Sequence, residues 1–297
     1  MNPAAGKPRF SSLPLAALLA GATCIALSPI WVRVSETGPT ASAFWRVALA
    51  VPALWLLTAL TRGNALPAGT TRGWPLLVAA GVAFAGDLGT WHTSIKLTSV
   101  ANSTVLANLA SIFVTLAAWI VWRQRPSALF VAGLAMALAG VGMLVRASAD
   151  FSPTALAGDA LGVVTAMFYA WYLLSVKLLR DRGVQVAALM AVTSSLTAAI
   201  LLPVALATGE TMLPATSLGW ATLLGLALIS HAAGQGLIAW SLAHLPASFS
   251  SVSLLFQPVM AALFAWVLLG EPLAALQIAG GLVVLGGIWL ARRASSA

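Results

Sequence analysis

The sequence predicts an all-α integral membrane protein of ten transmembrane helices, arranged as two inverted five-helix repeats with both termini in the cytoplasm. Three observations lead to this prediction: an apolar composition, ten apolar runs of membrane-spanning length, and an internal repeat. Of 297 residues, 60% are hydrophobic and only 7% are charged, whereas soluble domains carry about 25% charged residues. So few charges cannot coat a water-exposed surface, and the expected surroundings of the chain are a lipid bilayer.

The apolar runs are roughly 20 residues long, which is enough for a helix to cross the hydrocarbon core. They span residues 12–33, 40–61, 73–93, 98–122, 126–146, 158–178, 184–207, 217–240, 248–269 and 273–291. The first run could pass for a signal peptide, but it extends to about Val32 without a clear small-residue cleavage site. We therefore interpret it as the first membrane helix. Ten helices leave no room for a soluble domain.

The charged residues mark the orientation of these helices. If the N-terminus is cytoplasmic and the helices alternate, eleven Lys and Arg residues flank the inner ends and three, namely Arg33, Lys96 and Arg146, flank the outer ends. The inner residues are Lys7, Arg9, Arg62, Arg72, Arg123, Arg125, Lys177, Arg180, Arg182, Arg292 and Arg293. This distribution follows the positive-inside rule, with the turn near His244 as its one inner segment without Lys or Arg. The net charge of +8 is therefore not a nucleic-acid-binding patch.

A shift of 147 residues aligns the second half of the chain with the first over about fifty residues. It places Gly89 on Gly236, Ser94 on Ser241, Ser103 on Ser250, Trp119 on Trp266, Gly133 on Gly280 and Gly140 on Gly287. We expect residues 1–149 and 150–297 to be two repeats within one membrane domain. Because each repeat has an odd number of helices, the second would enter the membrane upside down, as in many secondary transporters with a substrate site near the midplane.

Polar residues within the bilayer are costly, so their spacing can reveal a protein-facing cavity. In 98–122, Thr104, Asn108, Ser111 and Thr115 share a helical face, and other runs show comparable stripes. The alternative is that these side chains only hold helices together. The residues that we expect to bind a small-molecule substrate are Asp87, Trp91, Asn108, Ser111, Tyr169, Tyr172, His231, Gln235, Ser253 and Gln257.

Arg46 and Asp87 are intramembrane charges that the orientation of the helices does not explain. Both would lie about 9–12 Å from the outer ends of neighbouring helices, so they could meet. One interpretation is a neutralising pair that fixes how the helices contact each other. The other makes Asp87 a proton-coupling carboxylate influenced by Arg46. His231 is a second titratable candidate for coupling, or else a hydrogen-bonded structural residue.

Helix-breaking residues predict where the helices bend or approach closely. Pro52, Pro203 and Pro258 lie inside apolar runs and are candidate hinges. The runs 126–146 and 273–291 are rich in glycine, which lets backbones approach closely. We therefore expect these two runs to form a scaffold and not a cavity wall.

Enzymatic functions have little support in the sequence. Asp87 and Asp159 both follow Ala-Gly, as in two-aspartate intramembrane proteases, but Asp159 would be an N-terminal charge at the start of the run 158–178. Motifs of serine hydrolases, zinc proteases and phosphate loops are absent. The single Cys24 permits no disulfide, and the few Asp, Glu, His and Cys residues suggest neither metal nor cofactor.

The most specific motif lies near the C-terminus. Pro258-Val259, Leu269-Gly270-Glu271 and the glycine-rich stretch from Gly280 resemble the EamA-type proteins of the drug/metabolite transporter superfamily. The resemblance implies ten helices in two inverted repeats, and with twelve tryptophans the chain is most similar to bacterial exporters of aromatic amino acids and methionine. The first repeat has Arg123-Gln124-Arg125 where Gly270-Glu271-Pro272 stands in the second. A role for Glu271 therefore has no counterpart there.

The expected function is export of amino acids or similar small metabolites by alternating access across the bacterial inner membrane. Efflux of cationic or aromatic drugs through Asp87 and the tryptophans is the main alternative. A channel would need a continuous polar pathway, and an intramembrane enzyme would need paired catalytic groups. We expect a monomer, although the sequence leaves larger assemblies open.

Overall fold

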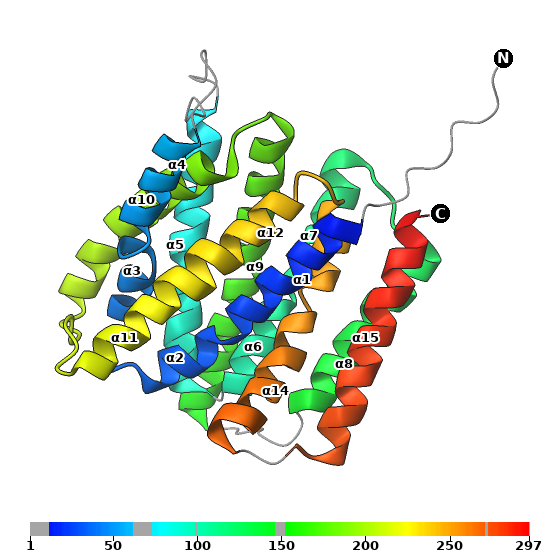
Figure 1. The fold of residues 1–297 in the computed structure, drawn as a ribbon. Helices are drawn as coiled ribbons and strands as arrows, with labels where there is room; N and C mark the ends of the chain where they lie inside the picture. Colours follow the sequence, from blue (N-terminus) through cyan, green and yellow to red (C-terminus); the bar gives the residue numbers. More distant parts are fainter. Residues whose placement is uncertain (1–11, 62–72, 99, 146–151, 271–272, 297) are drawn as a thin grey trace.

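The chain folds into a bundle of helices (Figure 1). A computed structural model describes residues 12–61, 73–98, 100–145, 152–270 and 273–296, and these residues contain no strand. The first half contains α1 (Ser12–Ala26), α2 (Ser28–Val34), α3 (Pro39–Ala48), α4 (Val51–Leu60), α5 (Trp74–Leu97), α6 (Val100–Asn108), α7 (Ala110–Trp122) and α8 (Ala128–Val145). The second half contains α9 (Pro153–Asp181), α10 (Val186–Ala207), α11 (Ser217–Gly225), the π-helix η3 (Leu226–Gln235), α12 (Gly236–Ser241), α13 (Ala247–Ser253), α14 (Phe256–Leu269) and α15 (Ala275–Ser296).

Several helices join end to end into longer apolar segments. Eight segments of the described chain are long and apolar enough to cross a membrane. They are Ser12–Val34, Pro39–Leu60, Asn102–Trp122, Pro153–Asp181, Val186–Ala207, Ser217–Ser241, Ala247–Leu268 and Ala275–Ser295. The other two predicted runs correspond to α5, which carries the polar residues Asp87 and His92, and to the shorter α8. The all-helical membrane fold is confirmed, while the count of ten crossings stays a prediction.

Four of the predicted runs contain an interruption of the helix. The breaks lie at Leu27, at Leu49 and Ala50, at Leu109, and at Leu254 and Leu255. Pro52 follows the second break and Pro258 follows the fourth, whereas Pro203 lies inside the continuous helix α10. The break at Leu109 has no proline beside it, so proline alone does not determine where these helices are interrupted.

Helices α8 and α15 lie side by side and form the most extensive helix contact in the bundle (Figure 1). A Cβ atom added to Gly140 would lie 2.6 Å from the carbonyl oxygen of Gly280, and one added to Gly133 would lie 2.8 Å from that of Gly287. Only glycine permits such an approach of two backbones. The expectation that these glycine-rich helices form a scaffold agrees with this contact.

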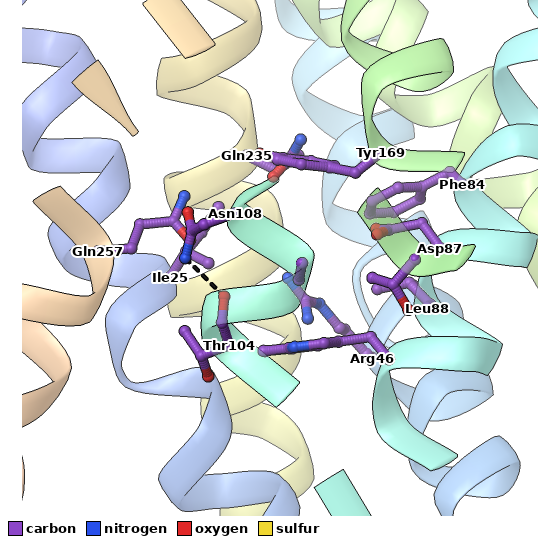
Figure 2. A pocket seen from close by; sticks show the side chains of 13 residues that line it. Ile25, Arg46, Phe84, Asp87, Leu88, Thr104, Asn108, Tyr169, Gln235 and Gln257 are labelled. Atoms are coloured by element: carbon purple, nitrogen blue, oxygen red, sulfur yellow. Dashed lines mark hydrogen bonds between the residues drawn. The ribbon is translucent and has the colours of Figure 1, made fainter. Parts of the chain in front are cut away.

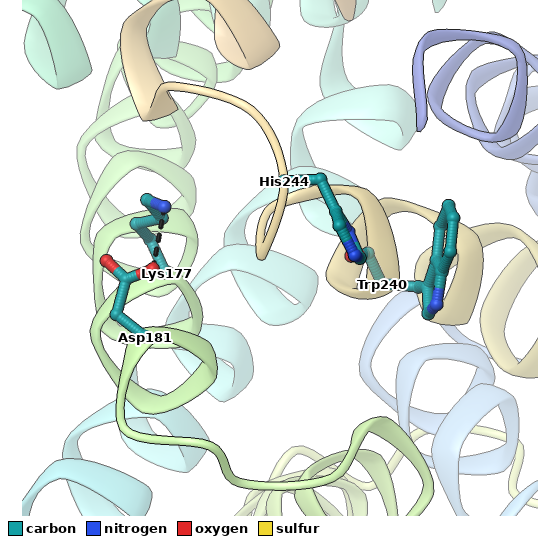
Figure 3. A network of polar contacts seen from close by, with 4 residues as sticks. All are labelled: Lys177, Asp181, Trp240 and His244. Atoms are coloured by element: carbon teal, nitrogen blue, oxygen red, sulfur yellow. Dashed lines mark hydrogen bonds and ion pairs between the residues drawn. The ribbon is translucent and has the colours of Figure 1, made fainter. Parts of the chain in front are cut away.

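The start of α1 and the end of α15 lie at the same end of the bundle, at the top of Figure 1. The ends of α7, α9 and α15, which carry Arg123, Arg182 and Arg293, lie there too. Figure 3 shows two contacts from this region: Lys177 and Asp181 form an ion pair at 2.7 Å, and the rings of Trp240 and His244 lie 4.6 Å apart. Lys7, Arg9, Arg62, Arg72, Arg146 and Glu271 lie outside the described residues.

At the opposite end, the turn between α2 and α3 is bound to the segment between α10 and α11. Glu36 accepts hydrogen bonds from the backbone of Ala215 and Thr216, at 2.8 and 3.1 Å, and from the Thr216 hydroxyl. The backbone N–H of Ala41 donates to Glu210 at 2.9 Å. Further bonds run from Gly38 to Thr211 O and from the Trp45 indole to Met212 O, at 3.1 and 2.6 Å. We call these contacts the end clasp.

Helix α9 begins earlier than the sequence suggests. It starts at Pro153, with the Ser152 hydroxyl accepting a hydrogen bond from the N–H of Ala155 at 3.2 Å. Asp159 is therefore not an N-terminal charge, and that interpretation was wrong. Its carboxylate accepts a hydrogen bond from Thr98, which lies eleven residues, or about 16 Å, along the chain of α5 from Asp87. The two aspartates consequently do not face each other.

Candidate binding pocket between the two halves of the chain

A pocket in the centre of the bundle is lined by residues from both halves of the chain. Its wall is formed by Ile25, Arg46, Phe84, Asp87, Leu88, Trp91, Thr104, Ala107, Asn108, Thr165, Tyr169, Gln235 and Gln257. The volume of this cavity is about 50 Å³. Since one water needs about 10–15 Å³, a cavity of this volume is large enough for a few water molecules. A metabolite would require it to widen.

One face of α5 supplies four of the wall residues. Phe84, Asp87, Leu88 and Trp91 follow a spacing of three, one and three residues, which places them on one helical face. The opposite face packs against α9, where Gly86 and Gly158 let the helices approach and the hydroxyls of Thr90 and Thr165 lie 2.7 Å apart. Helix α5 is thus held against the second half while its polar face lines the pocket.

Arg46 and Asp87 both project into the pocket, and Figure 2 shows them opposite Asn108 and Gln257. Their side chains are almost fully buried, with exposed fractions of 2% and 7%. They form no ion pair within 4.0 Å, and in the described part of the chain the one such pair is Lys177–Asp181. The guanidinium lies instead 5.8 Å from the ring centre of Trp91. Arg46 and Asp87 therefore form no direct salt bridge, and their interpretation as a neutralising pair stays a prediction.

The three amide side chains of the pocket lie where helices are interrupted or change from π-helical to α-helical geometry. Asn108 is the last residue of α6, Gln257 is the second residue of α14, and Gln235 ends η3. Asn108 donates to the carbonyl of Thr104 at 2.7 Å, as the dashed line in Figure 2 shows. Irregular backbone inside a membrane is tolerated where it lines a cavity, and π-helical segments often occur at functional sites. The irregular backbone of these helices and the polar side chains thus both point to the central pocket as the functional site.

Several hydrogen-bond donors in the wall have no partner. They are Nε and Nη1 of Arg46, Nε1 of Trp91, the hydroxyl of Tyr169, and Nε2 of Gln235 and of Gln257. Buried polar groups usually find a partner because leaving one unsatisfied costs about 1–3 kcal/mol. Such a concentration of unsatisfied donors around one space indicates that a polar ligand or ordered water completes their hydrogen bonds.

A layer of stacked rings lies behind the pocket wall. Phe84 stacks on Tyr172 at 4.4 Å and on His231 at 5.3 Å, between ring centres, and Tyr172 is also 6.3 Å from Tyr169. Tyr172 and His231 are buried and do not line the pocket. The Nε2 of His231 lies 2.7 Å from the hydroxyl of Ser194 in α10. These two predicted residues support the wall from behind.

Two other predicted residues are also absent from the wall. Ser111 donates to the carbonyl of Asn108 at 3.0 Å, and Ser253 to that of Phe249 at 2.9 Å, so each bonds to its own segment. The structure brings Asp87, Trp91, Asn108, Tyr169, Gln235 and Gln257 together, with Arg46 beside them. Among the residues that were not predicted, Thr104 shares its stripe with Asn108 and Phe84 shares a face with Asp87, so both signals were present in the sequence.

These features define a polytopic helical membrane protein with a central polar pocket, the general architecture of a small-molecule transporter. The EamA-like transporter family matches residues 12–146 and 156–293, and the chain belongs to this family. An uncharacterized transporter of Archaeoglobus fulgidus is 27% identical over 271 residues, which cover 88% of this chain and 90% of that protein. A crystal structure with 17% sequence identity has a TM-score of 0.77 and covers 95% of this chain and 96% of its own. The protein is thus a membrane transporter.

Proposed function

We propose that the protein exports amino acids, such as aromatic or other neutral ones and methionine, or similar small metabolites across the bacterial inner membrane. The observation that carries this proposal is the set of unpaired polar groups around the central pocket, since they can hold a small polar solute. Phe84, Trp91 and Tyr169 add aromatic surface suited to an apolar side chain.

We further propose that the halves 1–149 and 150–297 are inverted repeats that rock about the pocket in alternating access. The glycine contacts support this symmetry. Gly133 contacts Gly287, and Gly140 contacts Gly280. The shift of 147 residues carries Gly133 to Gly280 and Gly140 to Gly287, so it converts each contact into the other. Reciprocal contacts of this kind are expected of elements related by a two-fold axis. The small pocket volume supports a conformational change, because a substrate could enter only if the helices separated.

The proposed orientation has both termini in the cytoplasm. The ends of α7, α9 and α15 carry arginines on the side where α1 begins, and the positive-inside rule makes that side cytoplasmic. The end clasp then lies on the outer side of the membrane and would hold that side closed. Opening outward would require the hydrogen bonds of Glu36 to break.

Efflux of cationic drugs is the second candidate, because Asp87 lies beside Phe84 and Trp91 in the same pocket. Arg46 counts against it, since a buried guanidinium repels a cation. Transport assays can separate the two functions. Purified protein in proteoliposomes should take up labelled phenylalanine or methionine with saturable kinetics and show exchange when the amino acid is present on both sides. Uptake of a cationic dye without uptake of any amino acid would refute amino-acid export. The same assay with a proton gradient across the membrane would test whether transport is coupled to protons.

A further inference from the structure

We propose that Arg46 and Asp87 together recognise a zwitterion, with Arg46 binding the carboxylate of the transported amino acid and Asp87 binding its ammonium group. This inference rests on the proposed function and assigns the chemical basis of its selectivity. It treats the two charges as a divided binding site, in contrast to a structural ion pair or a proton-coupling device.

The state of the two charges is the first argument. Burying a carboxylate or a guanidinium without a partner is expensive, and such charges are normally paired. Arg46 and Asp87 face one pocket, yet they form no ion pair with each other. The carboxylate of Asp87 accepts no hydrogen bond from another described residue, although hydroxyls and amides lie on the same wall. A ligand that carries both charges would satisfy both residues at once.

The distribution of donors is the second argument. Besides Arg46, the indole N–H of Trp91 and the amides of Gln235 and Gln257 present unsatisfied N–H groups to the pocket. These groups can donate to a carboxylate, and a guanidinium can bind one in bidentate fashion. Asp87 is the acidic residue of the wall. The pocket therefore holds an excess of donors for an anion and one carboxylate for a cation, as a single zwitterionic head group requires.

The geometry of the helices is the third argument. Arg46 projects from α3 and Asp87 from α5, so each charge belongs to a different element of the first half. The amides of Gln235 and Gln257 come from the second half. A zwitterion bound between them would bridge the two halves. A solute with only one of the charges would leave either Arg46 or Asp87 unpaired.

The test compares three ligands of nearly equal shape: phenylalanine, 3-phenylpropionate, which lacks the ammonium, and 2-phenylethylammonium, which lacks the carboxylate. Binding to the full-length protein in lipid nanodiscs and inhibition of phenylalanine uptake are both measured. The wild type should bind phenylalanine at least about ten-fold more tightly than either analogue. Arg46→Gln should weaken phenylalanine binding by about ten-fold or more and favour the ammonium analogue, whereas Asp87→Asn should weaken it similarly and favour the propionate.

This crossed preference is measured within each variant, so a reduced folded fraction does not alter it. Arg182→Gln and Asp181→Asn are matched controls on the exposed end of α9 and should keep the wild-type order. Two outcomes would refute the zwitterion assignment while amino-acid export stands. In one, the wild type transports phenylalanine but both pocket variants lose binding of all three ligands equally. In the other, the wild type binds an analogue as tightly as it binds phenylalanine. If the wild type carries a cationic dye and no amino acid, both proposals are wrong.

Discussion

Replacing Gly287 with alanine should force α8 and α15 apart. The new Cβ would lie 2.5 Å from the nitrogen of Ala137, 2.7 Å from the oxygen of Gly133 and 2.8 Å from the Cα of Ala137. All three atoms belong to the backbone, so no side-chain rotation can relieve the contact. Overpacking of this kind costs about 1–3 kcal/mol. Because this contact is the most extensive in the bundle, the separation also weakens its neighbours along both helices.

Gly142→Ala is the matched control, because it lies on the same helix pair and a Cβ there meets nothing within 4 Å. Both substitutions gain the helix propensity of alanine, up to about 1 kcal/mol, so their difference isolates the cost of the contact. Thermal unfolding in one detergent should show Gly287→Ala melting several degrees below Gly142→Ala, at roughly 2–4 °C per kcal/mol. Equal melting temperatures, or a more stable Gly287→Ala variant, would refute the argument from close approach.

Three further predictions concern other parts of the molecule. The hydrogen bonds from Thr216 and Ala215 lower the pKa of Glu36 below its ordinary value of 4.5. The ionised carboxylate therefore stabilises the end clasp above pH 4.5, and this stabilisation is lost as the pH falls through the lowered pKa. Glu36→Gln should abolish this acid-dependent loss in melting curves, and an unchanged curve would contradict the assignment. His231→Phe should lower stability by about 1–3 kcal/mol, because Ser194 loses its partner, while the response of transport to a proton gradient stays that of the wild type. A response present in the wild type and lost in the variant would make His231 a coupling group. Pro258→Ala should leave uptake within about two-fold of wild type, because helices have unpaired N–H groups in their first turn anyway. Loss of uptake would instead support Pro258 as a hinge.

Most of the helices could be predicted from the sequence because a lipid bilayer constrains the length and polarity of the segments that cross it. A helix must be long and apolar to cross the bilayer, so hydropathy alone found the runs. The break at Leu109 could not be predicted in this way, since neither glycine nor proline accompanies it. Its counterpart at Leu254 and Leu255 does lie near a proline. The two breaks lie within two residues of each other under the 147-residue shift, so no single residue type determines where the helices are interrupted.

Where the helix is regular, helical periodicity correctly grouped residues that line the pocket. Asp87 and Trp91 lie one turn apart in the unbroken α5 and do share a face. The stripe from Thr104 to Thr115 crosses the break at Leu109, so Ser111 no longer follows the face of Asn108. His231 and Gln235 both belong to the π-helix η3, but Gln235 lines the pocket and His231 does not. Periodicity fails at these irregular segments because it assumes one constant turn.

The end clasp also limits how the protein can change in evolution. Apart from Glu36, Glu210, Trp45 and the Thr216 hydroxyl, its partners are backbone groups at positions 38, 41, 211, 212, 215 and 216. A backbone donor or acceptor is retained after almost any substitution, but its position shifts with every inserted or deleted residue. The segment between α10 and α11 should accordingly accept many sequences and few lengths. A change of one residue in its length would place every later partner out of reach of Glu36.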